Sequence, residues 1–253
     1  MTGATRATSR SSRGRRGARR ETSSPAGARR GTLGGPAVSP PRWRLKALTS
    51  RLPPQEWRRR LVHMCPGLLP SLFLVIPHVH PLSWYVRAPI LMVTLGLTIF
   101  SLMKARLFAR CGEQGWVCSV VSYAVITLGL LMAFPSQPEL GLVVTIIIAF
   151  GDGSATLAGM LAPGRGLPWN RAKSWAGMGA FLVCSIPLST IVYWGESRAG
   201  VSLAMSLACV VPAALAAAMA ETLPMRMNDN IRVGVAAGVT ILVTHGTFVG
   251  WNF

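Results

Sequence analysis

The sequence predicts an all-α protein: a polytopic membrane bundle of about seven transmembrane helices that follows a disordered, basic amino-terminal tail. Of the 253 residues, 51% are hydrophobic. From Pro66 to Trp251 they are grouped in stretches of roughly 17 to 21 residues, the length that about 30 Å of hydrocarbon requires of a helix. A helix in a soluble core would alternate polar and apolar faces instead. We therefore expect a tail over residues 1–50 and a transmembrane domain over residues 51–253.

The tail holds most of the positive charge. The chain has 26 Lys and Arg against 8 Asp and Glu, and sixteen of these cations lie in the first sixty residues. Arg, Ser, Gly, Ala and Pro dominate this segment, so it cannot bury enough apolar surface to fold. It is interpreted as a solvated extension, an attachment to anionic lipid head groups at about 1 kcal/mol per cation, or an organelle transit peptide. Specific nucleic-acid binding is not expected, because no aromatic residue precedes Trp43.

Seven apolar segments follow the tail, separated by charged residues or by Pro and Gly. The first is the weakest, since Pro66, Pro70 and Pro77 interrupt it. The predicted spans are roughly residues 64–80, 86–103, 116–134, 140–160, 175–194, 200–220 and 231–250, with six or eight spans as the alternatives.

The distribution of Lys and Arg predicts the orientation of these spans. Basic residues cluster after the second, fourth and sixth segments, whereas the other connections hold few. By the positive-inside rule the tail and the basic connections are cytoplasmic and the carboxyl end is outside. We expect a multi-pass protein of a bacterial inner membrane, with its polar motifs on the cytoplasmic side. The basic connections contain Lys104, Arg106, Arg110, Arg165, Arg171, Lys173, Arg226 and Arg232.

A carboxylate lies within the fourth segment, in the sequence AFGDGSATLAGM. An ionisable group at mid-bilayer costs about 2.5 to 3.5 kcal/mol on insertion scales, so Asp152 is a candidate site residue. Gly151 and Gly153 remove side chains beside it. They could admit a phosphate group, or they could serve helix packing through small residues.

Three further polar segments are predicted to lie at the same membrane face. Lys173 and Ser174 stand at the start of the fifth span, where a lysine and helix N–H groups can meet phosphates; the alternative is an interfacial lysine. Residues 220–230, AETLPMRMNDN, supply Glu221, Asn228, Asp229 and Asn230. Magnesium takes one or two carboxylates plus phosphate oxygens, so the three acids could hold it; the alternatives are a polar turn and a Glu221–Arg226 bridge.

The last of these segments, PQEWRRRLVHM, precedes the first span and places Glu56, Arg59 and His63 on one helical face. Alone it would be interpreted as a basic juxtamembrane helix. His78 and His80 fall on the outer side and His245 is isolated, so these three are interpreted as structural. The five cysteines show no spacing typical of a disulfide framework or zinc site.

Together these four segments resemble the family of CTP-dependent lipid kinases that includes dolichol kinase, phytol kinase and a diacylglycerol kinase, and that is related to phosphatidate cytidylyltransferase. The resemblance rests on E-x-x-R-R-x-x-H from Glu56 to His63, on GDGSATLAG, on KSWAG from Lys173, and on AE…NDN. It covers about residues 56–253. Related sequences usually carry Glu where this chain has Ala176, and often Ser where it has Met178, so one expected carboxylate is missing.

The resemblance implies transfer of a phosphoryl group from a nucleotide, CTP in the first place, to a lipid alcohol such as a polyprenol, phytol or diacylglycerol. The implied catalytic residues are Asp152, Glu221, Asp229 and Lys173, with magnesium held by the three acids. The implied substrate-binding residues are Arg59, His63, Gly151, Gly153, Ser174, Asn228 and Asn230.

Three alternatives stay open. Phosphatidate cytidylyltransferases usually end in a long polar K-D/H-G-G/D-R segment, which this chain lacks. A transporter would also bury carboxylates and glycines in broken helices, and a non-catalytic scaffold would fit the missing Glu.

Overall fold

The computed structural model describes residues 54–104, 116–162, 164–197 and 200–251. These residues form helices and no β-strand, apart from an isolated bridge between Gly166 and Ser174. The predicted all-α class is therefore confirmed. The predicted disorder of residues 1–50 lies outside the described residues, as do Arg106 and Arg110 of the first basic connection.

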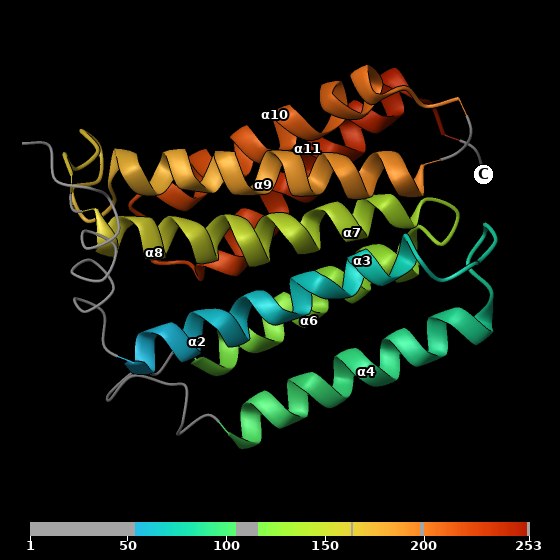
Figure 1. The fold of residues 1–253 in the computed structure, drawn as a ribbon, viewed down its shortest axis with the longest axis horizontal. Helices are drawn as coiled ribbons and strands as arrows, with labels where there is room; N and C mark the ends of the chain where they lie inside the picture. Colours follow the sequence, from blue (N-terminus) through green and yellow to red (C-terminus); the bar gives the residue numbers. More distant parts are fainter. Residues whose placement is uncertain (1–53, 105–115, 163, 198–199, 252–253) are drawn as a thin grey trace, which may run out of the picture. The chain divides into compact units, whose positions relative to one another are not determined.

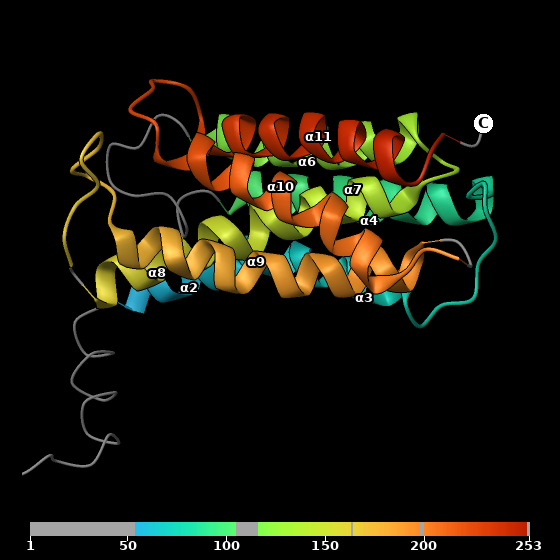
Figure 2. The ribbon, with the colours of Figure 1, turned by 90° about the horizontal axis from the view of Figure 1, so that it is seen from above.

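The chain runs back and forth in seven passes over the described residues, as Figures 1 and 2 show. Five of these passes are long and apolar enough to cross a membrane, and the chain is an integral membrane protein. The elements in order are α2 (Pro54–Met64), the 3₁₀ turn η1 (Cys65–Leu68), α3 (Leu69–Phe73), α4 (Trp84–Met103), α6 (Trp116–Ala133), α7 (Pro138–Ile146), the π-helical η2 (Ile147–Asp152), α8 (Gly153–Leu161), α9 (Trp175–Glu196), α10 (Leu203–Thr222) and α11 (Asp229–Phe248).

The first pass differs from the predicted span over residues 64–80. It begins ten residues earlier, at Pro54, and its last helix ends at Phe73. Pro66 and Pro70 lie in the first turns of η1 and α3, the position where a residue without an N–H is tolerated. The prolines therefore divide the pass into the polar helix α2 and two short pieces, η1 and α3, that follow it. In Figure 1, α2 and α3 lie nearly in line.

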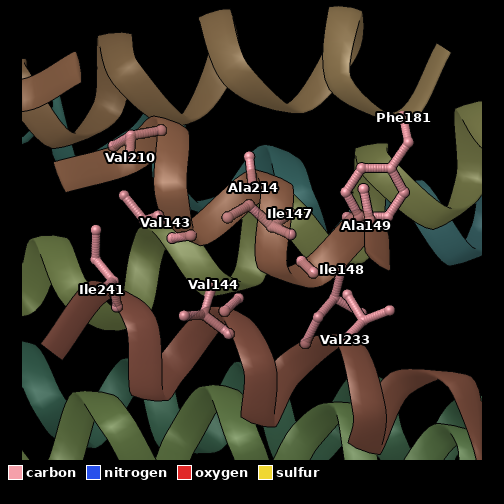
Figure 3. Packing of buried hydrophobic residues seen from close by; sticks show 14 of the residues in the cluster. Val143, Val144, Ile147, Ile148, Ala149, Phe181, Val210, Ala214, Val233 and Ile241 are labelled. Atoms are coloured by element: carbon pink, nitrogen blue, oxygen red, sulfur yellow. The ribbon is translucent and has the colours of Figure 1, made fainter. Parts of the chain in front are cut away.

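The fourth pass, α7–η2–α8, forms the centre of the bundle, with 83% of its most apolar stretch buried. Figure 3 shows Val143, Val144 and Ile147 packed against residues of α10 and α11. A row of alanines on α10 allows close approach of neighbouring backbones. By contrast, α4 has no buried residue. The alanines are Ala213, Ala214, Ala217 and Ala218, each at most 1% exposed.

The alternating passes create two ends. At the first, called the site end, α2, α6, α9 and α11 begin and α4, α8 and α10 finish. At the other, called the opposite end, α3, α6, α9 and α11 finish. Asp152 closes the π-helical stretch in the middle of the fourth pass. An extra residue per turn here changes the direction of the side chain, and such π-bulges are frequent at functional sites.

Candidate active site

A polar cavity of about 680 Å³ opens at the site end. Residues from all four of the polar sequence segments line it, although up to 171 positions separate them in the chain. The structure thus brings nine of the eleven predicted site residues together. They are Arg59, His63, Asp152, Lys173, Ser174, Glu221, Asn228, Asp229 and Asn230.

Asp152 is one of two buried carboxylates in this cavity, with 9% of its side chain exposed, against 3% for Glu221. Its Oδ2 lies 3.5 Å from Arg60 Nη1 and 3.4 Å from His63 Nε2, both from α2. The prediction named Arg59, which also lines the cavity, and did not name Arg60. The two arginines are neighbours in the same motif, and only the rotation of α2 selects the partner of Asp152.

His63 is also held by an aromatic contact. Its ring meets the Tyr123 ring edge-on at 5.7 Å between centroids. Its Nε2 atom faces Asp152 and the cavity.

Lys173 joins the other two carboxylates. Its ammonium group donates a hydrogen bond to Glu221, and its Nζ lies 3.6 Å from Asp229 Oδ2. Burial alone would lower the pKa of Lys173, but Glu221 and Asp229 raise it above its ordinary value. The lysine is therefore a permanent cation at physiological pH, and Glu221 is bound by Lys173 rather than by Arg226.

The connection between α8 and α9 sets the position of Lys173. Leu167 is fully buried, Trp169 Nε1 donates to the Thr222 hydroxyl at 3.2 Å, and Asn170 Nδ2 donates to the Thr222 carbonyl at 3.0 Å. These contacts attach the connection to the last residue of α10, next to Glu221. No charge pattern in the sequence indicates these contacts, although an aromatic and an amide side chain in a short connection are a weak signal.

Arg232 supports the same cluster from α11. Its guanidinium donates to Asp229 and to the carbonyls of Ala220 and Leu223, at 3.0 and 2.6 Å for the carbonyls. It thus binds carbonyl groups at the end of α10 and orients Asp229. Sequence reasoning interpreted Arg232 only as a topological charge, and its spacing of three residues from Asp229 was the available signal.

Three of the predicted substrate-binding residues already have structural partners. The Ser174 hydroxyl accepts from the Gly177 N–H at 3.1 Å and caps α9. Asn228 caps α11 through the Asn230 N–H at 2.9 Å. The Asn230 amide donates to the backbone and hydroxyl of Ser119 on α6. All three still line the cavity, where they fix the helix ends around Lys173 and Asp229.

Gly151 and Gly153 do not line the cavity. A Cβ at Gly151 would lie 2.6 Å from the Phe181 ring, and one at Gly153 would lie 2.6 Å from Met64. The space on the Cβ side of both glycines is therefore filled by neighbouring helices, as in helix packing through small residues. Ala176, the position of the missing Glu, does not line the cavity either, whereas Gly177 and Met178 do.

An apolar groove of about 430 Å³ adjoins the polar cavity. It lies between the first pass, α4 and α6, and the two spaces share His63 and Ser119 in their walls. The groove is lined mostly by aliphatic and aromatic side chains, among them Leu69, Phe73, Val93 and Leu97. The groove therefore runs from the apolar part of the bundle to the polar cavity.

The donor set of the cavity fits a magnesium–nucleotide complex. Three carboxylates line it together with four cationic side chains, Arg59, Arg60, Arg171 and Lys173. Carboxylate oxygens are the protein ligands that magnesium prefers, and arginine and lysine match phosphate oxygens. Two of the carboxylates, Asp152 and Glu221, are buried, so they require cations beside them.

Comparison with known proteins finds plant phytol kinases. The probable chloroplastic phytol kinase of Triticum aestivum is 30% identical over 129 residues, or 49% of this chain and 43% of that protein. Probable phytol kinase 1 of Oryza sativa is 28% identical over 129 residues, 49% of this chain and 41% of that protein. The probable chloroplastic phytol kinase of Zea mays is 30% identical over 119 residues, or 45% of this chain and 39% of that protein. The chain thus matches less than half the length of these relatives.

No family model and no solved structure matches the chain. The relatives are named as chloroplast proteins, so they give no support to the expected bacterial inner membrane.

Proposed function

We propose that this chain is a membrane-embedded lipid kinase that transfers the terminal phosphoryl group of a nucleoside triphosphate to a long-chain lipid alcohol. The observation that carries the proposal is the junction at His63 and Ser119, where the apolar groove meets the polar cavity. A lipid alcohol has the same division, with a long hydrocarbon chain and one small polar end. The similarity to phytol kinases supports an isoprenoid alcohol such as phytol as the first acceptor to test.

The polar cavity is assigned to the nucleotide. Asp152, Asp229 and Glu221 would hold magnesium, which neutralises phosphate charge and helps align the groups in phosphoryl transfer. Lys173, Arg59 and Arg60 would contact phosphate oxygens. CTP is the proposed donor on the sequence resemblance alone.

The groove is assigned to the hydrocarbon chain of the acceptor. With the chain between α4 and α6, the hydroxyl group comes to the end of the groove at His63. Burying a chain of this kind stabilises the complex by about 25 cal/mol for each Å² of apolar surface. The acceptor therefore reaches the site from the membrane and needs no passage through water.

The reaction follows from this placement. The acceptor oxygen attacks the terminal phosphorus, the bond from that phosphorus to the bridging oxygen breaks, and the nucleoside diphosphate leaves with the electron pair. His63 Nε2 takes the hydroxyl proton. The resulting imidazolium is stabilised by Asp152, 3.4 Å away. Lys173, Arg59 and Arg60 stabilise the charge on the leaving diphosphate, the main electrostatic task in phosphoryl transfer.

Labelled nucleotides test the proposal directly. Purified full-length chain in detergent is incubated with phytol, a polyprenol or diacylglycerol and with CTP or ATP labelled in the α or the γ phosphate. The expected result is γ label in a lipid monophosphate, abolished by a chelator and restored by magnesium. Label from the α phosphate in the lipid, with pyrophosphate released, would show nucleotidyl transfer instead. No labelled lipid with any of the acceptors would contradict the proposal.

A further inference from the structure

A second cluster of polar side chains lies at the opposite end of the bundle, away from the polar cavity, and one of its members, His78, also lines the apolar groove. His78 and His80 belong to the connection between α3 and α4, and Glu196 is the last residue of α9. The Glu196 side chain is only 2% exposed. A carboxylate at this depth after an apolar helix requires a cation or donors beside it.

The three side chains converge on one point. His78 Nε2 lies 2.5 Å and His80 Nε2 lies 3.8 Å from the same atom, Glu196 Oε1. One ligand atom from each residue falls within 4.8 Å of the other two. Around tetrahedral zinc, with bonds of about 2.0 to 2.1 Å, ligand atoms are separated by about 3.3 Å. The two distances from the histidine nitrogens to Glu196 Oε1 lie on either side of that value. Small side-chain rotations would therefore bring the three ligand atoms to tetrahedral spacing.

A hydrogen bond behind His78 prepares its ring as a ligand. His78 Nδ1 lies 2.8 Å from the Ile76 carbonyl, which can only accept, so Nδ1 carries the proton. Metal-binding histidines almost always donate their second nitrogen to such an outer partner. Nε2 is then left with a lone pair directed at Glu196. Without a metal, the contact between Nε2 and Glu196 Oε1 requires a proton on one of these two atoms.

We propose that His78, His80 and Glu196 bind one zinc(II) ion, with water as the fourth ligand. Two imidazoles and one carboxylate favour zinc over magnesium, which prefers oxygen ligands. His80 is the most exposed of the three, at 25% of its side chain, and marks the side open to water. The ion fastens the α3–α4 connection to the end of α9. The close packing of Leu74 on Gly195 shows that these two segments already touch.

Metal analysis of the full-length chain tests this site and does not depend on the kinase reaction. The chain is purified in detergent without a polyhistidine tag, stripped with a chelator, reloaded with zinc and desalted. The expected content is one zinc per chain. His80→Ala and Glu196→Gln should each weaken binding by more than about 100-fold, because loss of an outer-shell partner alone costs 10- to 100-fold. The matched control is Glu139→Gln, which removes a buried carboxylate at the same end and should keep the zinc.

Cobalt(II) in place of zinc gives a readout that a variant of altered stability cannot imitate. The wild type should show the visible absorption of a tetrahedral cobalt site. His80→Cys should retain the metal and add a sulfur-to-metal charge-transfer band, which arises only if side chain 80 is a ligand. Wild-type protein that retains no zinc after reloading would refute the proposal. Equal zinc retention in folded His80→Ala and Glu196→Gln would refute it as well.

Discussion

At the scale of single residues, the site depends on carboxylates that are held beside cations. Asp152 contacts Arg60 and His63, while Glu221 and Asp229 share Lys173. Removing Lys173 would leave the buried Glu221 carboxylate without compensation, which is more costly than losing the whole pair. These ion pairs make the cavity polar. In the proposed complex, magnesium would bind the carboxylates and the nucleotide phosphates would bind the cations in their place.

Asp152→Asn tests this arrangement most directly. The change keeps the side-chain shape, removes the charge that would hold magnesium and stabilise His63, and eases insertion of an apolar pass. We expect normal expression and a turnover reduced by about 100-fold or more, because a metal ligand is lost. The measurement is the initial rate of lipid phosphate formation, with size-exclusion chromatography as the check on folding. Glu139→Gln is the matched control. Wild-type turnover in Asp152→Asn would leave a packing role for Asp152.

At the scale of elements, the caps and connections position the charged groups. The connection before α9 is attached to Thr222 on α10, and Ser174 then begins α9 beside Lys173. The first pass and α4 form the walls of the groove, and α4 contacts the bundle mainly through α6. The polar site thus rests on well-packed helix ends, whereas the groove has one loosely packed wall.

Ser174 caps the start of α9 at the site end, and Ser202 caps the start of α10 at the opposite end, so Ser202 serves as a matched control. Ser174 and Ser202 both accept a backbone N–H, at 3.1 and 3.2 Å, and begin α9 and α10. Replacing either by Ala should lower stability by about 1 kcal/mol, measured by thermal unfolding in detergent. Only Ser174→Ala should also lower turnover, since it displaces Lys173. An equal loss of turnover in Ser202→Ala would contradict a local role for Ser174.

A bulky side chain in the groove tests the acceptor site. Leu97→Trp places an indole among the lining residues, so the KM for phytol should rise about tenfold or more while the KM for the nucleotide stays constant. A side chain forced into filled space typically costs 1 to 3 kcal/mol. Met92→Trp changes an exposed residue of the same helix outside the groove and is the matched control. Equal kinetics in both variants would exclude this groove as the acceptor site.

At the scale of the whole molecule, the odd number of passes separates the two ends of the described chain. Basic residues flank the connections at the site end, including Arg165, Arg171 and Arg226. The positive-inside rule predicts that this end faces the cytoplasm, where nucleotides are supplied. The proposed zinc site at the opposite end would then face the other compartment.

Reporter tags test this orientation. Tags inserted after Arg165 and Arg226, and one after Arg110, should be protected in sealed vesicles of cytoplasmic-side-in orientation, whereas a tag after Phe253 should be accessible to protease. The reason is that the basic connections resist translocation. Protection of all four tags would contradict the seven-pass topology.

The sequence by itself determined the class of protein, the seven passes, and the four polar segments that meet at one end. These follow from local properties, namely the length of an apolar stretch, the sign of a flanking charge and the cost of a buried carboxylate. Even the weakest predicted span, over residues 64–80, overlaps the first pass of the structure. Its predicted boundaries differ from the observed ones, because prolines near helix starts end one helix and begin the next.

Only the tertiary structure decided which side chains are partners. Arg60 rather than Arg59 reaches Asp152, Lys173 rather than Arg226 binds Glu221, and Phe181 and Met64 fill the space beside Gly151 and Gly153. The same holds for His78 and Glu196, which are 118 positions apart. Each outcome depends on the rotation and depth of one helix against another. Contacts between segments distant in sequence set these quantities, and no local pattern contains them.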